Sequence, residues 1–327
     1  MRYPNFIKKS DIIGICAPSA GVGNKLDEFN ESLEVLKNEG YKVVETKSVR
    51  KDSDRSANAK QRAKEFEELI LDNKIKMIIA ATGGDYMFEV LPYINFDNIN
   101  NNLKWFMGFS DPTNLLYTIT TKLDIATLYG FNGSSYKLDA PKYQKDNLEF
   151  IKGNLVKQNS YRKCQSFIDT CNDVTQMKDD VKWISKNDEL NIEGRLIGGC
   201  FEIISKIIGT KYDYTLDFIE RYKEDGIVWF FDIFNMNSFD FYLSLLQMKY
   251  AGYFKYTKAV LFGRVAFPNV VDKKLDYLKA MDKVLGNIPH IAEMDIGHTH
   301  PKMTLINGSI INVKYKNNKG SLSFKLK

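Results

Sequence analysis

Short apolar runs alternate with helical segments through the first third of the chain, and this pattern restricts the fold more than any other feature. Each run ends at a polar or glycine-containing break, as strands buried on both faces of a sheet do. Apolar residues recur at helical spacing from Leu26 to Leu36, and Gly40 closes that segment. This β-α-β-α order predicts a doubly wound α/β domain with a mostly parallel sheet. The expected strands are residues 12–17, 41–45, 77–81 and 106–109, and a second helix is expected over residues 57–71.

The length of 327 residues indicates two domains, at roughly 100–200 residues each. Polar and charged residues replace the regular pattern between residues 143 and 189. We therefore expect an N-terminal α/β domain over residues 1–150 and a linker over residues 151–190. A smaller C-terminal α/β domain is expected over residues 191–327.

The C-terminal part has its own strand and helix signals. Residues 227–231 and 259–262 are apolar runs typical of buried strands, and residues 242–250 between them have helical spacing. The tail predicts a β-hairpin made of residues 309–315 and 321–325, with a turn over residues 317–320.

Composition excludes several classes of protein. The net charge of +5 is spread over 46 basic and 41 acidic residues, without a basic stripe interleaved with aromatic residues, so nucleic acid is not an expected partner. The N-terminus lacks the long apolar segment of a signal peptide, and no run is long enough to cross a bilayer; we expect a cytoplasmic protein without membrane partners. The cysteines form no C-x-x-C pair and are expected to be buried free thiols. They are Cys16, Cys164, Cys171 and Cys200.

The most informative local motif is Gly108-Phe109-Ser110-Asp111-Pro112, which lies between an expected strand and an expected helix. A tight strand-to-helix turn exposes a serine hydroxyl at a helix N-terminus, where backbone N–H groups stabilise an oxyanion. The alternative is that Ser110 or Asp111 only caps the helix. The second glycine of the G-x-S-x-G motif is absent, so the general hydrolase pattern is not matched.

A serine nucleophile needs a base and an orienting carboxylate. The chain has three histidines, His290, His298 and His300. One of His298 and His300, in a loop-like stretch, could be the general base, and an exposed loop histidine without a role is the alternative. Asp232 directly follows the apolar run 227–231. It is a candidate for the carboxylate, because the carboxyl ends of strands in an α/β sheet line a crevice that holds site residues. The alternative is an aspartate that only forms a turn. The histidine pair lacks a third ligand at suitable spacing, so no metal site is expected.

A second glycine-containing loop, Thr82-Gly83-Gly84-Asp85, follows another expected strand end. Two consecutive glycines allow backbone N–H groups to approach a ligand closely. The loop does not have the G-x-G-x-x-G pattern, so a dinucleotide is not indicated.

In order and spacing, these motifs resemble the LD-carboxypeptidase and microcin C self-immunity family of serine peptidases, over nearly the whole chain. Residues 117–122 and 124–129 look most similar to the microcin-immunity branch. The segments that carry the resemblance are Ala17-Pro18-Ser19, residues 80–85, residues 108–114, residues 194–199, Gly263-Arg264 and Gly297-His298-Thr299.

The resemblance implies a Ser-His-Glu triad in a cleft between two domains and hydrolysis through an acyl-enzyme, without a metal or organic cofactor. The serine falls on Ser110, the histidine on His298, and the glutamate position on Asp232, which is one methylene shorter. Backbone N–H groups of Gly84 or Asp85 and of Asp111 would form the oxyanion hole.

The implied substrates are muropeptides with an L,D bond or peptidyl-nucleotides of the microcin C type, and the implied assembly is a homodimer. Two alternatives remain: a protein of the same fold that sequesters its ligand because the shorter Asp232 impairs turnover, and an unrelated α/β module that binds small molecules. We expect the strand end to compensate for the shorter side chain, because a carboxylate is kept at this position.

Overall fold

The computed structural model describes residues 1–51, 54–168 and 177–327, which divide into two units. The first unit contains Met1–Val156 and Thr304–Asn307, and the second contains Lys157–Met303 and Gly308–Lys327. The chain therefore returns to the first unit for four residues near its C-terminus. The second unit includes most of the segment expected to be a linker.

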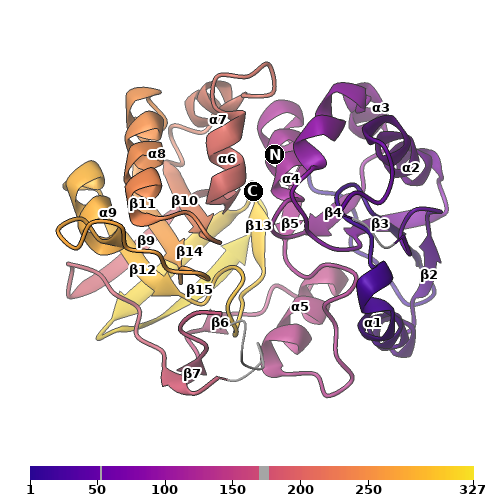
Figure 1. The fold of residues 1–327 in the computed structure, drawn as a ribbon, viewed down its shortest axis with the longest axis horizontal. Coiled ribbons are helices and arrows are strands. Elements are labelled where there is room, and N and C mark those ends of the chain that lie inside the picture. Colours follow the sequence, from indigo (N-terminus) through magenta and orange to yellow (C-terminus); the bar gives the residue numbers. More distant parts are fainter. Residues whose placement is uncertain (52–53, 169–176) are drawn as a thin grey trace. The chain divides into compact units, whose positions relative to one another are not determined.

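The first unit is built on a six-stranded sheet in the order β13-β5-β4-β3-β1-β2 (Figure 1). All neighbouring pairs are parallel except β13–β5. The strand order reverses between β1 and β3, and in such sheets a ligand site lies beyond the carboxyl ends of the strands at this switch point. The strands are β1 (Ile12–Cys16), β2 (Lys42–Glu45), β3 (Ile75–Ala80), β4 (Trp105–Gly108), β5 (Thr127–Tyr129) and β13 (Leu305–Asn307).

Helices cover both faces of this sheet, which confirms the doubly wound fold. Figure 1 shows α2, α3 and α4 on one face and α1 and α5 on the other. Asn58 caps α2 by accepting the Gln61 N–H through its side chain, which explains why the helix begins two residues later than its apolar pattern predicts. The bounds are α1 (Leu26–Asn38), α2 (Ala59–Leu71), α3 (Phe96–Asn101), α4 (Thr113–Leu123) and α5 (Lys142–Lys152), with 3-10 turns at Gly23–Lys25 and Met87–Tyr93.

The second unit contains a seven-stranded mixed sheet in the order β12-β11-β10-β9-β14-β15-β6. The strands from β12 to β9 are parallel, and the others are antiparallel. The strands are β6 (Gln158–Asn159), β9 (Glu189–Cys200), β10 (Ile227–Asp232), β11 (Thr257–Gly263), β12 (His290–Met294), β14 (Ile310–Lys316) and β15 (Lys319–Lys325). A separate two-stranded ladder joins β7 (Lys163–Cys164) to β8 (Asp179–Asp180).

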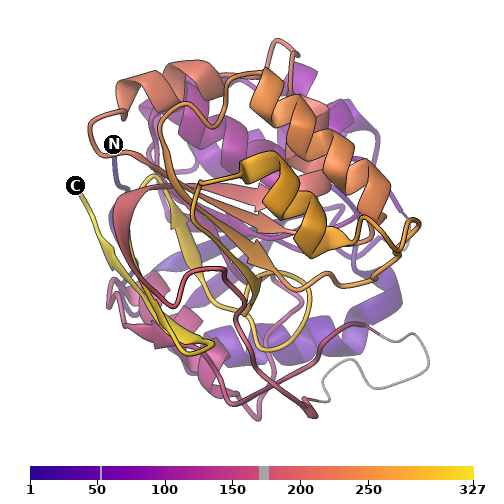
Figure 2. The same ribbon diagram turned by 90° about the vertical axis from the view of Figure 1, so that its left-hand side faces the viewer.

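The helices of the second unit follow its parallel strands. Figure 2 shows α8 and α9, both in orange, packed side by side. All six residues of β10 are buried, so the carboxylate of Asp232 at its end must find polar partners within the fold. The helices are α6 (Phe201–Ile207), α7 (Thr215–Arg221), α8 (Ser238–Tyr250) and α9 (Tyr277–Leu285).

The C-terminal hairpin is present, but its turn is tighter than expected. Lys316 pairs with Lys319, which leaves Asn317 and Asn318 as a two-residue turn. Both asparagines have positive φ, at 51° and 61°, as a type I′ turn requires. Lys319 and Gly320, expected in the turn, therefore belong to β15.

Two further expectations were that the cysteines are buried free thiols and that no segment is long enough to cross a bilayer. Cys16, Cys164 and Cys200 are buried free thiols, as expected, and Cys171 lies outside the described residues. In the described part of the chain, every helix is too short or too polar to cross a bilayer.

Candidate active site

Ser110 lies in a strained turn between β4 and α4. Its φ is 70°, in the left-handed region that non-glycine residues rarely adopt. The turn is held by hydrogen bonds from the Thr113 N–H to the Ser110 carbonyl, 2.9 Å, and from the Phe109 N–H to Asn132 Oδ1, 3.1 Å. Helix α4 begins directly after Pro112, which itself has helical φ and ψ of −50° and −18°. The surrounding fold thus maintains a strained serine at a strand-to-helix turn, the setting of a nucleophile elbow.

The glycine-containing loop after β3 lies directly beside Ser110. A Cβ atom at Gly83 would lie 3.2 Å from Ser110 Oγ, which is tighter than most Cβ contacts, so the Gly83 backbone lies close against the hydroxyl. Gly84 has a φ of 146°, and a Cβ atom there would overlap the Ser19 hydroxyl. The Ala20 N–H donates to the Gly83 carbonyl at 3.2 Å. The loops after β1, β3 and β4 therefore meet, as expected for the ends of adjacent strands. Asp85, the last residue of the glycine-containing motif, is exposed.

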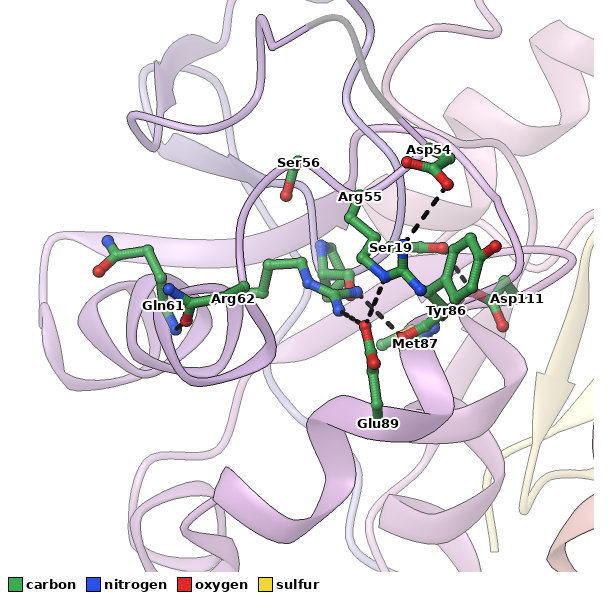
Figure 3. Close-up of polar contacts among 12 residues, drawn as sticks. Ser19, Asp54, Arg55, Ser56, Gln61, Arg62, Tyr86, Met87, Glu89 and Asp111 are labelled. Carbon is green, nitrogen blue, oxygen red and sulfur yellow. Dashed lines mark hydrogen bonds and ion pairs between the residues drawn. The ribbon is translucent and has the colours of Figure 1, made fainter.

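Asp111, next to Ser110, has a side-chain role that the sequence did not indicate. Its carboxylate is almost completely buried, at 1% exposure. It accepts hydrogen bonds from the Ser19 hydroxyl and from the Met87 N–H at 2.8 Å (Figure 3). It also accepts one from Asn114 Nδ2 at 2.8 Å. The sequence suggested only the backbone N–H of Asp111 as a functional group.

The structure brings Asp232 and His298 together within the second unit. The Asp232 carboxylate lies 2.9 Å from His298 Nδ1 and accepts the His298 backbone N–H at 3.3 Å. Gly297 has a φ of 97°, and a Cβ atom there would overlap the same carboxylate. The His298 backbone thus comes close enough for an aspartate to reach the ring. A carboxylate on Nδ1 leaves the basic lone pair on Nε2.

The His298 ring is also held by an aromatic neighbour. The ring of Phe234, in the loop after β10, lies 4.4 Å from the imidazole, centroid to centroid. Glu202 holds this loop, because its Oε1 accepts the backbone N–H groups of residues 234, 235 and 236 at 2.8, 2.9 and 3.0 Å. One carboxylate thus orders the segment that packs against the imidazole.

An ion pair supports the loop that carries His298. The Arg264 guanidinium donates to Asp295 Oδ1 at 2.8 Å and to Thr299 Oγ1 at 3.0 Å, and the carbonyls of Glu293 and Pro301 accept at 3.2 and 3.1 Å. These residues flank His298 on both sides, and the two charged side chains are at most 2% exposed. Burial raises the pKa of Asp295, and Arg264 opposes this shift. The Gly263-Arg264 motif was the only sequence signal for this arrangement.

Residues from the expected linker complete this support. Trp183 Nε1 and the Tyr161 N–H each donate to Asp295 Oδ2 at 3.2 Å. The Gln165 N–H donates to the His300 carbonyl at 2.7 Å. This part of the chain therefore has a structural role in the histidine loop.

The other two histidines have different surroundings. Nε2 of His290, in β12, lies 3.0 Å from Asp282, and Nδ1 lies 3.2 Å from the Ile288 carbonyl. The His300 N–H donates to the side chain of Gln165 at 3.4 Å. Over residues 1–51, 54–168 and 177–327, no group of three or more His, Cys, Asp or Glu side chains is arranged to hold a metal ion.

Lys302, four residues after His298, is a buried cation whose charge interacts with the carboxylate of Asp232. Burial lowers the pKa of Lys302 to about 8, and the negative charge of Asp232 opposes the shift. No motif in the sequence indicated Lys302.

Comparisons with known proteins agree on one family. A model of the LD-carboxypeptidase N-terminal domain matches residues 13–130, and the corresponding C-terminal domain model matches residues 193–313. The microcin C7 self-immunity protein MccF of Escherichia coli is 27% identical over 332 residues, covering 96% of this chain and 93% of the relative.

Solved structures show the same fold. The structure of MccF with aspartyl sulfamoyl adenosine has a TM-score of 0.83 and 24% identity and covers 99% of both chains. Muramoyltetrapeptide carboxypeptidase from Oxalobacter formigenes has a TM-score of 0.76 and 21% identity, and the match covers 96% of this chain and 98% of that one.

Proposed function

The chain belongs to the LD-carboxypeptidase family, and on that premise we propose that it is a serine peptidase that hydrolyses amide bonds through an acyl-enzyme. Ser110 is the nucleophile, His298 is the general base, and Asp232 is the carboxylate that orients His298. Backbone N–H groups of Gly84 or Asp85 and of Asp111 hold the oxyanion. The proposal needs no metal or organic cofactor.

The chemistry follows from these roles. Ser110 Oγ attacks the carbonyl carbon while His298 Nε2 accepts the hydroxyl proton, and the carbonyl oxygen becomes an oxyanion. When the C–N bond breaks, His298 returns the proton to the leaving amine, and an ester on Ser110 remains. Water attacks this ester with His298 again as base, which releases the acid and regenerates the serine. Asp232 stabilises the imidazolium that forms twice in each cycle.

The contact between Asp232 and His298 carries the proposal. A buried carboxylate on Nδ1 is the arrangement that a general base of this kind requires. The 2.9 Å distance supports turnover over the sequestering alternative, in which the shorter aspartate impairs catalysis. The strained φ of Ser110 and the adjacent glycines give independent support for the nucleophile.

Two substrate classes fit the relatives. MccF is a microcin C7 self-immunity protein that has been solved with an aspartyl sulfamoyl nucleoside, and the Oxalobacter protein is a muramoyltetrapeptide carboxypeptidase. We propose that the substrate here is a small peptide or peptidyl-nucleotide. Both classes belong in the test, because the matches to MccF and to the Oxalobacter carboxypeptidase each cover 96% of this chain.

The test is a mass-spectrometric assay of both substrate classes with the wild type and the Ser110→Ala variant. The wild type should release amine from one class, and Ser110→Ala should lose nearly all turnover while keeping the wild-type Tm. A trapped acyl-enzyme should add the mass of the acyl group to the peptide that contains Ser110. Wild-type turnover by Ser110→Ala would disprove the mechanism.

Two further features of the proposal concern assembly and localisation. We propose a homodimer, which light scattering at micromolar concentration tests, since only a 37.6 kDa species would contradict it. We also propose that the protein acts in the cytoplasm, which fractionation of cells tests directly.

A further inference from the structure

The side chains of Asp111 and Arg62, which have opposite charges, connect the loop after β1 to the segment after β3. They bind neighbouring residues in each of these two segments. Asp111 accepts from the Ser19 hydroxyl, in the loop after β1, and from the Met87 N–H, beyond the loop after β3. Arg62, on α2, donates to the carbonyls of Pro18 and Tyr86 at 2.9 and 3.1 Å. Figure 3 shows both connections.

Both side chains are buried, so neither connection is a solvent-exposed contact. The Arg62 side chain is 0% exposed and also pairs with Glu89. Burial lowers the pKa of Arg62, and the negative charges of Glu89 and Asp111 oppose that shift. Removing the charge of either side chain would therefore leave the other buried with less electrostatic compensation for its lost hydration.

The two connected loops flank the glycines that lie against Ser110. Gly83 is held to the first loop by the hydrogen bond from Ala20, and it approaches Ser110 Oγ closely. The position of the Gly83–Gly84 backbone therefore depends on the distance between the loops. An oxyanion donor is effective only when it is held at hydrogen-bond distance from the developing charge.

We propose that the Asp111 carboxylate, assisted by Arg62, is a positioning residue that holds the Gly83–Gly84 backbone against the Ser110 hydroxyl. The inference rests on the proposed function, in which the N–H group of Gly84 or of the adjacent Asp85 holds the oxyanion of the serine reaction. Asp111 acts through the loops and does not contact the substrate with its side chain.

The test variant is Asp111→Asn, which keeps the size of the side chain and removes its charge. An amide in place of Oδ1 would face Asn114 Nδ2, and an amide in place of Oδ2 would face both the Ser19 hydroxyl and the Met87 N–H. In either orientation the hydrogen bonds from Ser19 and Met87 are lost or lose the assistance of the negative charge. The loops should separate slightly, so kcat should fall by roughly tenfold or more, below the 10²–10³-fold loss from deleting an oxyanion donor. KM should stay within about threefold of wild type, because the hydrogen bond from the loop N–H to the oxyanion forms only in the transition state.

Glu65→Gln is the matched control. Glu65 is another buried carboxylate of the first unit, at 2% exposure, and it accepts hydrogen bonds from the Ser48 N–H at 3.1 Å and the Ser48 hydroxyl at 2.7 Å. It lies on α2 and does not hold the loops beside Ser110. Its variant should lower Tm by an amount similar to Asp111→Asn while leaving kcat within about twofold of wild type.

The outcomes are distinguishable. A loss of kcat in Asp111→Asn no larger than in Glu65→Gln, with Ser110→Ala inactive, overturns the positioning role alone. Full activity of Ser110→Ala overturns the proposed function first. If Asp111→Asn does not fold, Ser19→Ala removes one of its three donors. Its kcat should then fall roughly three- to tenfold, and a value within twofold of wild type overturns the inference.

Discussion

Replacing Arg264 by methionine isolates the buried charge beneath the histidine loop. The substitution keeps an apolar stem and removes the guanidinium, which now donates to Asp295, to Thr299 and to two carbonyls. Breaking a buried ion pair by removing one partner costs about 3–5 kcal/mol. We expect the lower end, about 3 kcal/mol, because Asp295 keeps hydrogen bonds from Trp183 and Tyr161.

This loss should depend on pH in a defined direction. Burial already raises the pKa of Asp295, and without Arg264 it rises further above its unfolded value. A carboxyl group whose folded pKa is raised destabilises the fold at pH values above the unfolded pKa, and the penalty disappears below it. The stability deficit of Arg264→Met should therefore be largest at pH 7 and should shrink towards pH 4.

The assay is urea unfolding of the wild type, Arg264→Met and Arg264→Met/Asp295→Asn at both pH values. The asparagine keeps an acceptor for Trp183 and Tyr161 without a charge, so the double variant should recover at least about half of the lost stability at pH 7. In thermal unfolding of the 327-residue chain as one unit, the single variant should lose roughly 4 °C of Tm. Both variants should have reduced kcat, because both lose the hydrogen bond to Thr299.

The reasoning is refuted by either of two results. If the double variant is no more stable than Arg264→Met at pH 7, an unpaired charge is not the cause of the loss. If the deficit of Arg264→Met is equal at pH 7 and pH 4, the titration of Asp295 does not contribute.

Three further predictions concern residues around the imidazole. Asp232→Asn should lower kcat by roughly 10²–10⁴-fold, and Asp232→Glu should also lower it, because the Gly297 backbone leaves no room for another methylene; unchanged kcat in the Asn variant would remove Asp232 from the mechanism. His298→Gln should abolish turnover while His300→Gln keeps most of it, and equal losses would contradict the assignment. Lys302→Met should stabilise the protein below pH 8 by up to about 3 kcal/mol, because the pKa of Lys302 falls from 10.5 to about 8 on burial. This gain should vanish as the pH rises to about 10.5, where the unfolded chain also loses the proton, and a gain that is constant with pH would show that Lys302 is not the titrating group.

Much of the fold was predictable because its signals are local. Burial on both faces makes parallel strands continuously apolar, so β1, β3, β4 and β10 are visible in the sequence as runs. Their alternation with helical periodicity determines a doubly wound sheet, since only a crossover connects parallel neighbours. The strand-to-helix position of Ser110 is visible for the same reason.

Other features depended on tertiary structure. The regular pattern disappears in the stretch that contains Tyr161, Gln165 and Trp183, because these residues are ordered by contacts with the histidine loop and not by periodicity. The sequence predicts a turn over residues 317–320, which is too long. Only the strand register shows that Lys316 pairs with Lys319, so that the turn consists of Asn317 and Asn318, both with positive φ. Helix α5 was missed, because its apolar face is recognisable only against the sheet that it covers.

The sequence could identify Ser110, Asp232 and His298 as a set only by resemblance. Asp232 and His298 are 66 residues apart, and their contact depends on the parallel order of β10, β11 and β12 and on the path of the loop at Gly297. The side-chain roles of Asp111 and Arg264 depend in the same way on which strand ends are neighbours. A local pattern records which residues are buried, whereas a hydrogen bond between distant residues requires the register and order of strands, which only the assembled sheet determines.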